Sequence, residues 1–310
     1  MLLTSVVSSG PIPRRDGRVA STENPWREDR YGFLRWCVLP DDEWSEWWER
    51  IYVDPELKRK LRAHANFALR HREEFSPVGL PVHGLALLYG PPGTGKSSLV
   101  RGLANVVAGD LAADGFSDQV IFAELDPHAL PSQMLGESQR NTINLLEKSL
   151  PEIAAKGCPV MVAIDEINSL AVSRGLAAGG RDPVDVMRAT EAVLRGLDYL
   201  AASHKNVYIV GTSNFVATLD EAVFDRIDVV FEIHLPDEEL IELILSDTFG
   251  ELSNVAIAAT ELKELAAVLV GRSGRDIRKT VLEALVTRGG AADRPLTAQE
   301  IVSVVERGSE

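Results

Sequence analysis

Apolar and polar positions follow two different periods along this chain, and together they predict alternating strands and helices. Five short apolar runs, rich in Val, Ile and Leu, each predict a buried strand. Between these runs, apolar residues recur every three or four positions, which is typical of amphipathic helices. The predicted strands are 85–89, 119–124, 159–164, 207–212 and 229–233, and the helices between them are 96–108, 139–155, 184–202 and 219–225. This order predicts an α/β fold, with a five-stranded parallel sheet covered by helices on both faces.

The pattern changes after Pro236, where the strand-like runs stop. Four later segments keep the apolar spacing of a helix, and no strand separates them. These segments are 237–250, 258–270, 273–288 and 297–307. We therefore expect a large α/β domain at 38–236, followed by a small all-helical domain at 237–310.

The start of the chain predicts a flexible arm over residues 1–37, because 1–24 is rich in Ser, Gly, Pro and Arg. All five tryptophans fall within 25–53, which favours a packed apolar segment or a subunit contact over a ligand cage. A helix over 54–75 follows, with Asp54 as its cap and Pro55 in its first turn.

Composition narrows the classes of protein. The 310 residues are 45% apolar and 25% charged, with a formal net charge of -14, which argues against a constitutive nucleic-acid binder but not against a local basic channel. Cys37 and Cys158 lack metal-ligand spacing and are expected to be buried bystander thiols. No apolar run reaches the roughly 18 residues of a membrane span, and no basic leader precedes the first apolar residues. A cytoplasmic protein is expected.

The first predicted strand leads into GPPGTGKS at 90–97, and a helix follows. This context favours a phosphate-binding P-loop over a Gly/Pro-rich connector. Backbone N–H groups of Gly93, Gly95 and Lys96 are expected around the β-phosphate, with the Lys96 ammonium on the β and γ oxygens and the Ser97 hydroxyl on Mg²⁺. The predicted nucleotide-binding residues are Gly90, Pro91, Pro92, Gly93, Thr94, Gly95, Lys96, Ser97 and Ser98.

Two acids, Asp165 and Glu166, follow the third predicted strand. We expect Asp165 to hold Mg²⁺ with Ser97, and Glu166 to orient and deprotonate the attacking water. A solvated strand end or a helix cap is the alternative interpretation. The fourth strand leads to Asn214, which is placed to hold the lytic water or the γ-phosphate.

Arg226 is one of two arginines that are candidates for contact with the phosphates. Arg226 is the only Lys or Arg between Lys205 and Lys263, and it is predicted to be an arginine finger for the ATP site of a neighbouring subunit. The alternative is a surface ion pair with Asp225 or Asp228.

In the helical domain, Ser273 is expected to cap a helix from which Arg275 reaches the γ-phosphate; the alternative is a helix-surface arginine. Arg278 and Lys279 are expected to be surface charges. Met134 and Leu135 precede a glycine in a polar loop. They are predicted either to grip polypeptide in a pore or to anchor the loop.

The motifs GPPGTGK, IDE, TSN and SGR, in this order, resemble those of AAA+ ATPases that remodel proteins. Four further segments are similar to the pachytene-checkpoint remodellers of HORMA-domain proteins, a likeness that covers about residues 38–290. These segments are LPDDEWSEWWERIYVDPELKRKL at 39–61, DPVDVMRATEAVLRGLDYL at 182–200, FDRID at 224–228 and SGRDIRK at 273–279.

The resemblance implies a homo-hexameric ring that hydrolyses ATP and threads a HORMA-domain client from its N-terminus. It also implies that the helical domain is a lid and that Tyr52 and Val53 lie near the adenine. Two features depart from the family: Met134 stands where an aromatic residue is usual, and only about 38 residues precede the similar region. The short form resembles prokaryotic members, which implies a role in anti-phage signalling.

Two other functions stay open at this point. One is a nucleic-acid motor or clamp-loader-like ATPase, which the acidic balance and the lack of a basic, aromatic stripe argue against. The other is a nucleotide-gated scaffold with little turnover, which the presence of Glu166 argues against.

Overall fold

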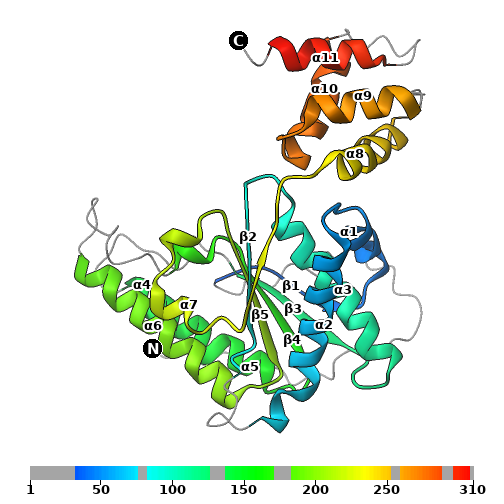
Figure 1. Ribbon diagram of the computed structural model, residues 1–310. Helices are drawn as coiled ribbons and strands as arrows, with labels where there is room; N and C mark the ends of the chain where they lie inside the picture. Colours follow the sequence, from blue (N-terminus) through cyan, green and yellow to red (C-terminus); the bar gives the residue numbers. More distant parts are fainter. Residues whose placement is uncertain are drawn as a thin grey trace, which may run out of the picture.

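A twisted sheet forms the centre of the larger part of the molecule (Figure 1). The computed structural model describes residues 32–75, 82–125, 137–170, 183–252, 259–287 and 296–307. Within these ranges the sheet has six strands, in the order β1-β3-β4-β5-β2-β6. They are β1 Phe33–Leu39, β2 Leu85–Tyr89, β3 Val120–Leu125, β4 Val160–Ile164, β5 Val207–Ser213 and β6 Val229–Glu232. Strands β2 to β6 are parallel, which confirms the predicted five-stranded parallel sheet.

Strand β1 corrects the expected start of the ordered domain. It pairs antiparallel with β3 at the edge of the sheet, so the boundary expected at residue 38 lies inside a strand. The apolar signal is weak here because Arg35 interrupts it and most side chains of this strand are only half-buried. Of the tryptophans that follow, Trp44 and Trp48 are buried in the core, as the packed-segment interpretation predicts.

Helices cover both faces of the sheet (Figure 1). On one face lie α1 Ser45–Glu49, α2 Pro55–His71 and α3 Lys96–Ala113; on the other lie α4 Glu137–Asn144, α5 Leu150–Ala154 and α6 Pro183–Ser203. A π-helical segment, Leu145–Ser149, joins α4 to α5. It precedes Pro151, which has no N–H for a regular helical bond. The short α7 Glu221–Phe224 lies between β5 and β6.

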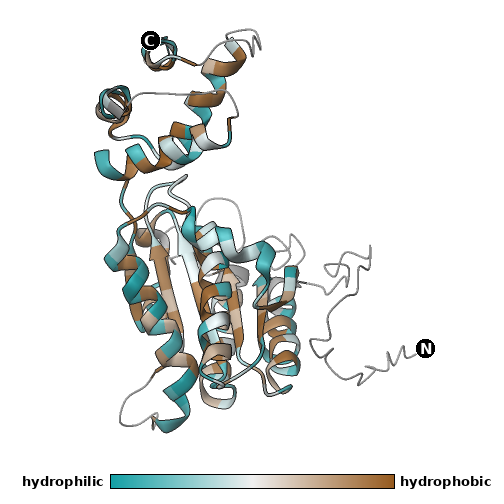
Figure 2. Ribbon diagram, turned by 90° about the vertical axis from the view of Figure 1, so that its right-hand side faces the viewer, coloured by the Kyte–Doolittle hydropathy of each residue, from teal (hydrophilic) through white to brown (hydrophobic). Residues whose placement is uncertain are grey.

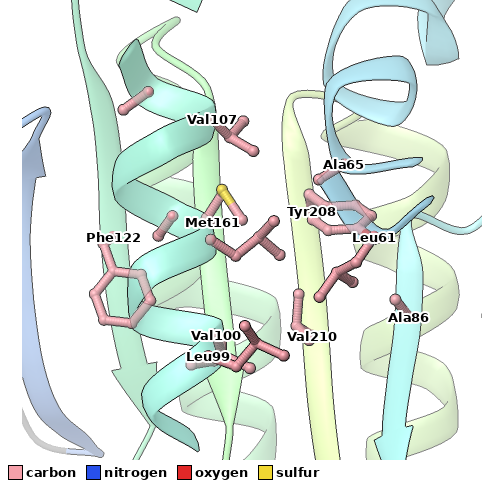
Figure 3. Close-up of a cluster of buried hydrophobic side chains, with 14 of the residues drawn as sticks. Leu61, Ala65, Ala86, Leu99, Val100, Val107, Phe122, Met161, Tyr208 and Val210 are labelled. Atoms are coloured by element: carbon pink, nitrogen blue, oxygen red, sulfur yellow. The ribbon is translucent and has the colours of Figure 1, made fainter. Parts of the chain in front are cut away.

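Alternation along each strand divides the apolar residues between two cores. Ala86 and Tyr208 face the layer of α2 and α3, where they pack with Leu61 (Figure 3). The neighbouring Leu87 and Ile209 face the layer of α5 and α6. Strands β2 to β5 read as continuous apolar runs because both of their faces are buried, whereas the edge strand β6 is partly exposed.

The four remaining helices form a group with its own apolar core. They are α8 Glu238–Gly250, α9 Ala259–Leu269, α10 Gly274–Thr287 and α11 Ala298–Arg307. The group lies beyond one end of the sheet (Figure 1), and apolar and polar stretches alternate along its helices (Figure 2). In the described part of the chain, no helix is long and apolar enough to cross a membrane.

Candidate active site

The P-loop connects β2 to α3 through backbone conformations that favour glycine. Gly90, Gly93 and Gly95 have φ of 150°, 80° and 91°, values that residues with a Cβ rarely adopt. A Cβ on Gly90 would lie 2.0 Å from the carbonyl oxygen of Ile233. The predicted residues Gly90, Pro91, Pro92, Gly93, Thr94 and Gly95 form the loop, and Lys96, Ser97 and Ser98 begin α3. The loop therefore lies at a helix N-terminus, where backbone N–H groups favour an anion.

The Lys96 side chain is bonded within this loop. It is buried, with 7% of its surface exposed, and its Nζ donates to the carbonyl oxygens of Gly90 and Pro91 at 2.8 and 2.9 Å. A third bond, of 2.7 Å, goes to Asn214 Oδ1 at the end of β5. Burial lowers the pKa of Lys96, while the charges of Glu166 and Asp165 oppose that shift. The ammonium is thus held beside both predicted acids.

Asp165 lies next to the start of α3. Its Oδ1 accepts a hydrogen bond of 2.8 Å from Ser97 Oγ and another from Thr212 Oγ1. A hydroxyl beside a carboxylate is a ligand pair suited to Mg²⁺ with its waters. No cluster of three or more His, Cys, Asp and Glu that could hold a metal exists among the described residues.

Glu166 has an unusual backbone conformation for a residue with a side chain. Its φ is 52°, a left-handed conformation that costs on the order of 1–3 kcal/mol in a non-glycine residue. Its N–H donates to Thr212 Oγ1 at 3.2 Å, and Asn214 Nδ2 donates to its Oε1. Asn214 therefore connects Lys96 to Glu166. Thr212 was not predicted; its position in the strand before Asn214 is the signal that could have identified it.

The helical group returns to the P-loop through the start of α10. The backbone N–H of Arg275 donates to the Gly93 carbonyl at 3.1 Å, and a Cβ on Gly93 would lie 2.3 Å from Ser273 Oγ. The Asp276 N–H donates to Ser273 Oγ at 3.3 Å, which confirms Ser273 as the cap. The Arg275 side chain is exposed, yet its charge contributes to the lowered pKa of Lys96. Its role toward the γ-phosphate stays a prediction.

A cleft opens beside the P-loop. Its lining combines both parts of the molecule: Ile51, Tyr52, Gly93, Thr94, Gly95, His234, Pro236, Ile244, Gly274 and Arg278. Tyr52 lines the cleft as the adenine prediction requires, whereas Val53 is not among the lining residues and packs in the core. Ile51 and Ile244 were missed because they are ordinary apolar residues, 193 positions apart, that only folding brings together.

An ion cluster closes one side of this cleft. Arg278 Nη2 lies 2.8 Å from Asp247 Oδ2, and Arg50 Nε lies 3.0 Å from Asp247 Oδ1. Burial raises the pKa of Asp247, but hydrogen bonds from Arg278 and Arg50 outweigh it and hold that pKa below its ordinary value. The Arg278 side chain is 37% exposed, as expected of a surface charge, but the acid on α8 also draws it into a cluster beside the cleft.

Arg226 follows α7 and is bonded to its own subunit. Nε and Nη2 donate to the two Asp198 carboxylate oxygens at 2.6 and 2.8 Å, and Nη1 donates to the Ala222 carbonyl at 2.6 Å. Arg226 therefore forms a surface ion pair, as the alternative interpretation expected, but its partner is Asp198 and not Asp225 or Asp228. The Asp228 carboxylate accepts instead from the N–H groups of His83, Gly84 and Leu85.

The predictions for the pore loop and for the two cysteines have different outcomes. Met134 and Leu135, the pore-loop candidates, lie outside the described residues. Cys37 and Cys158 form no disulfide. Burial raises the pKa of the Cys37 thiol to about 12, which fits an unreactive bystander.

Comparison with known proteins matches the chain to one family. The model of the family described as "ATPase family associated with various cellular activities (AAA)" matches residues 86–235. CD-NTase-associated protein 6 of Pseudomonas aeruginosa is 36% identical over 289 residues, which are 90% of this chain and 93% of that protein. A pachytene checkpoint protein 2 homolog of Oryza sativa subsp. indica is 32% identical over 76% of this chain, which spans only 50% of that longer relative.

Two solved structures have the same fold. The PCH-2 structure of C. elegans superimposes with a TM-score of 0.74 and 26% identity, covering 89% of this chain and 76% of that one. A chain in the E. coli MS115-1 HORMA:CdnC:Trip13 complex gives a TM-score of 0.75 at 20% identity, covering 89% of this chain and 95% of that one.

Proposed function

Because the chain belongs to the AAA ATPases, in the group that includes CD-NTase-associated protein 6 and the pachytene checkpoint proteins, we propose that it is an ATP-driven remodeller. Its clients would be HORMA-domain proteins, whose complexes it disassembles. One observation carries the catalytic part of the proposal: Asn214 joins Lys96 to Glu166. The side chain proposed to bind phosphate and the one proposed as general base are thereby both bonded to one residue, which directly follows β5.

The residues present fit ATP and Mg²⁺. The P-loop glycines leave no room for a Cβ at Gly90 or Gly93, and the buried Lys96 ammonium is directed at the loop. Mg²⁺ supplies charge neutralisation on the phosphate oxygens, and Ser97 with Asp165 would hold it. Lys96 would bind the β and γ oxygens, and Ser98 lies two residues further along the same helix.

Glu166 would take the proton of the attacking water on its carboxylate. Asn214 donates to that carboxylate and so fixes its direction. The Glu166 carboxylate lies within electrostatic reach of Lys96: its negative charge opposes the lowering of the Lys96 pKa by burial. Arg275 would add positive charge at the γ-phosphate from the helical lid, whose backbone contacts Gly93.

Hydrolysis would take place between subunits of a homo-hexameric ring. Arg226 would approach the nucleotide of the neighbouring copy as an arginine finger, a contribution on the order of 10³–10⁵ in turnover. Both of its fixed contacts lie on its own α6 and α7, away from its own P-loop in the chain. A single copy would accordingly hydrolyse ATP very slowly.

The client proposal draws on the resemblance to pachytene-checkpoint remodellers. It is supported by one solved complex, whose named components are HORMA, CdnC and Trip13, because that complex includes a chain of this fold. Met134 and Leu135 would pack against the extended client inside the ring, since methionine adapts its shape to irregular apolar surfaces. By the same analogy, the protein would regulate anti-phage signalling in the cytoplasm.

The test is ATP-dependent dissociation of a HORMA-domain protein from its bound peptide or partner, followed by fluorescence. Wild type should release the client. Glu166→Gln should bind ATP and client but release neither phosphate nor partner, because an amide cannot accept the proton.

The double variant Met134→Ala, Leu135→Ala should hydrolyse ATP yet dissociate the client poorly. Full dissociation by this variant would contradict threading. Strong stimulation of the ATPase by DNA at physiological salt, with no response to a HORMA protein, would favour a nucleic-acid motor instead.

A further inference from the structure

The Arg226 guanidinium is held from two directions by described residues. Arginine has five N–H donors in a planar fork. Asp198 takes the Nε donor and one Nη2 donor, and the Ala222 carbonyl takes one Nη1 donor. In these contacts one N–H remains on each terminal nitrogen. Both are N–H donors of a charged guanidinium, which bonds strongly to carboxylates and phosphates.

Both anchors belong to rigid parts of the fold. Asp198 lies on α6, where its neighbours Leu197 and Leu200 are buried in the core. Ala222 lies on α7, next to the fully buried Val223. Two bonds to one carboxylate and one to a main-chain carbonyl therefore fix the plane of the guanidinium relative to the core, and little rotamer freedom is left to lose when an anion binds.

The pair lies where another molecule can reach it. The Arg226 side chain is 24% exposed and that of Asp198 is 49% exposed. The hydrogen bonds that Arg226 donates to the Asp198 carboxylate raise the pKa of Arg226, so the guanidinium stays charged throughout the physiological range.

We propose that Asp198 is a positioning residue for Arg226, fixing the guanidinium so that its remaining N–H donors are presented to a phosphate oxygen of the nucleotide in a neighbouring copy. This inference rests on the proposed function, in which that arginine acts between subunits. Asp198 itself touches no phosphate. Asp198 holds the Arg226 side chain in one orientation in advance, so that less conformational entropy is lost on reaching the transition state.

The experiment compares ATP turnover of the assembled full-length protein carrying Asp198→Ala, Asp198→Asn or Asp225→Asn. The first variant removes both bonds to the fork, and the second removes the charge. The third is a matched control, because it removes an equal charge beside Arg226 and none of the three bonds described above. We expect kcat to fall about tenfold in both Asp198 variants, with KM for ATP within about twofold of wild type. The control should stay within about twofold of wild type in both constants.

A double-mutant cycle distinguishes positioning from a general structural effect. Asp198→Ala should cost about tenfold alone but nothing further in an Arg226→Ala background, because the residue it orients is gone. An equal loss in both backgrounds would show that Asp198 acts on stability, and would overturn the inference. An increase in kcat for Asp198→Asn would also overturn it, since that result means the carboxylate competes with phosphate for the arginine.

Failure of the premise has a separate signature. If Arg226→Ala itself turns over ATP at the wild-type rate, the intersubunit finger is refuted. If Arg226→Ala loses on the order of 10³-fold while Asp198→Ala keeps wild-type kcat, only the positioning role is refuted.

Discussion

At the scale of single residues, Asn214 is the side chain on which the site geometry depends. It follows β5, and its amide reaches a cation on α3 and an acid after β4. Because β4 and β5 are parallel neighbours, their carboxyl ends meet at one edge of the sheet, and so do the residues that follow them. An amide suits this position because it offers an acceptor to Lys96 and a donor to Glu166.

Substitution of Asn214 should separate these two contacts. Asn214→Asp keeps an acceptor for Lys96 but sets a carboxylate against Glu166, and like charges at this distance favour a shared proton over a free base. We expect kcat to fall about 10²-fold, within the range for general base catalysis, with ATP affinity retained. Phosphate release and nucleotide titration would measure this. A fall in affinity with unchanged kcat would show that Asn214 serves binding only.

At the scale of elements, the contact between α3 and α1 sets the position of the cleft. Gly102 lies in α3, where an added Cβ would be 2.6 Å from the Trp48 nitrogen and 2.7 Å from its Cα. These are backbone atoms of α1, so no side-chain rotation can relieve the clash. Since α1 leads directly to Ile51 and Tyr52 in the cleft lining, the close approach of the two helices also determines where the nucleotide base would lie.

Gly102→Ala should therefore destabilise the protein by about 1–3 kcal/mol through overpacking and weaken ATP binding. Gly109→Ala is the matched control on the same helix, because nothing lies within 4 Å of its added Cβ. The control should raise stability by about 0.5–1 kcal/mol, the usual gain of alanine over glycine in a helix. Thermal unfolding with and without ATP measures both. Equal stability of the two variants would mean that the helices can separate freely.

At the scale of the whole molecule, the candidate site is incomplete in either part alone. The P-loop and acids belong to the sheet, whereas Ile244, Gly274 and Arg278 of the cleft come from the helical group. The Arg50–Asp247–Arg278 cluster and the bond from Arg275 to Gly93 connect the two parts at the cleft. A ligand in the cleft would therefore contact both parts of the molecule and could shift their relative arrangement. A nucleotide-driven remodeller needs this coupling between ligand and conformation.

Mixing of subunits tests the assembly. Arg226→Ala and Lys96→Ala should each abolish hydrolysis alone, but their mixture should recover part of it. An interface that combines the intact arginine of one copy with the intact P-loop of the next is complete. Turnover measured against mixing ratio should pass through a maximum at intermediate composition. A flat line at every ratio would place both residues in the same chain's site.

Periodicity and short motifs in the sequence determined the five parallel strands, most helix positions, the P-loop and the strand-end location of Asp165, Glu166 and Asn214. These features depend on neighbours within a few positions, and β2 to β5 could be recognised because both of their faces are buried. Strand β1 escaped recognition because a half-buried edge strand containing Arg35 lacks that signal.

Only the tertiary structure decided which residues meet across long separations in the chain. Asp198 was inconspicuous among 46 acidic residues, and nothing local assigns it to Arg226. Ile51 and Ile244 likewise share a cleft because two parts of the fold face each other. Such contacts arise from the packing of whole helices and strands, and the physical reason they stay hidden is that the sequence pattern of each element records only which side is buried, not what it is buried against.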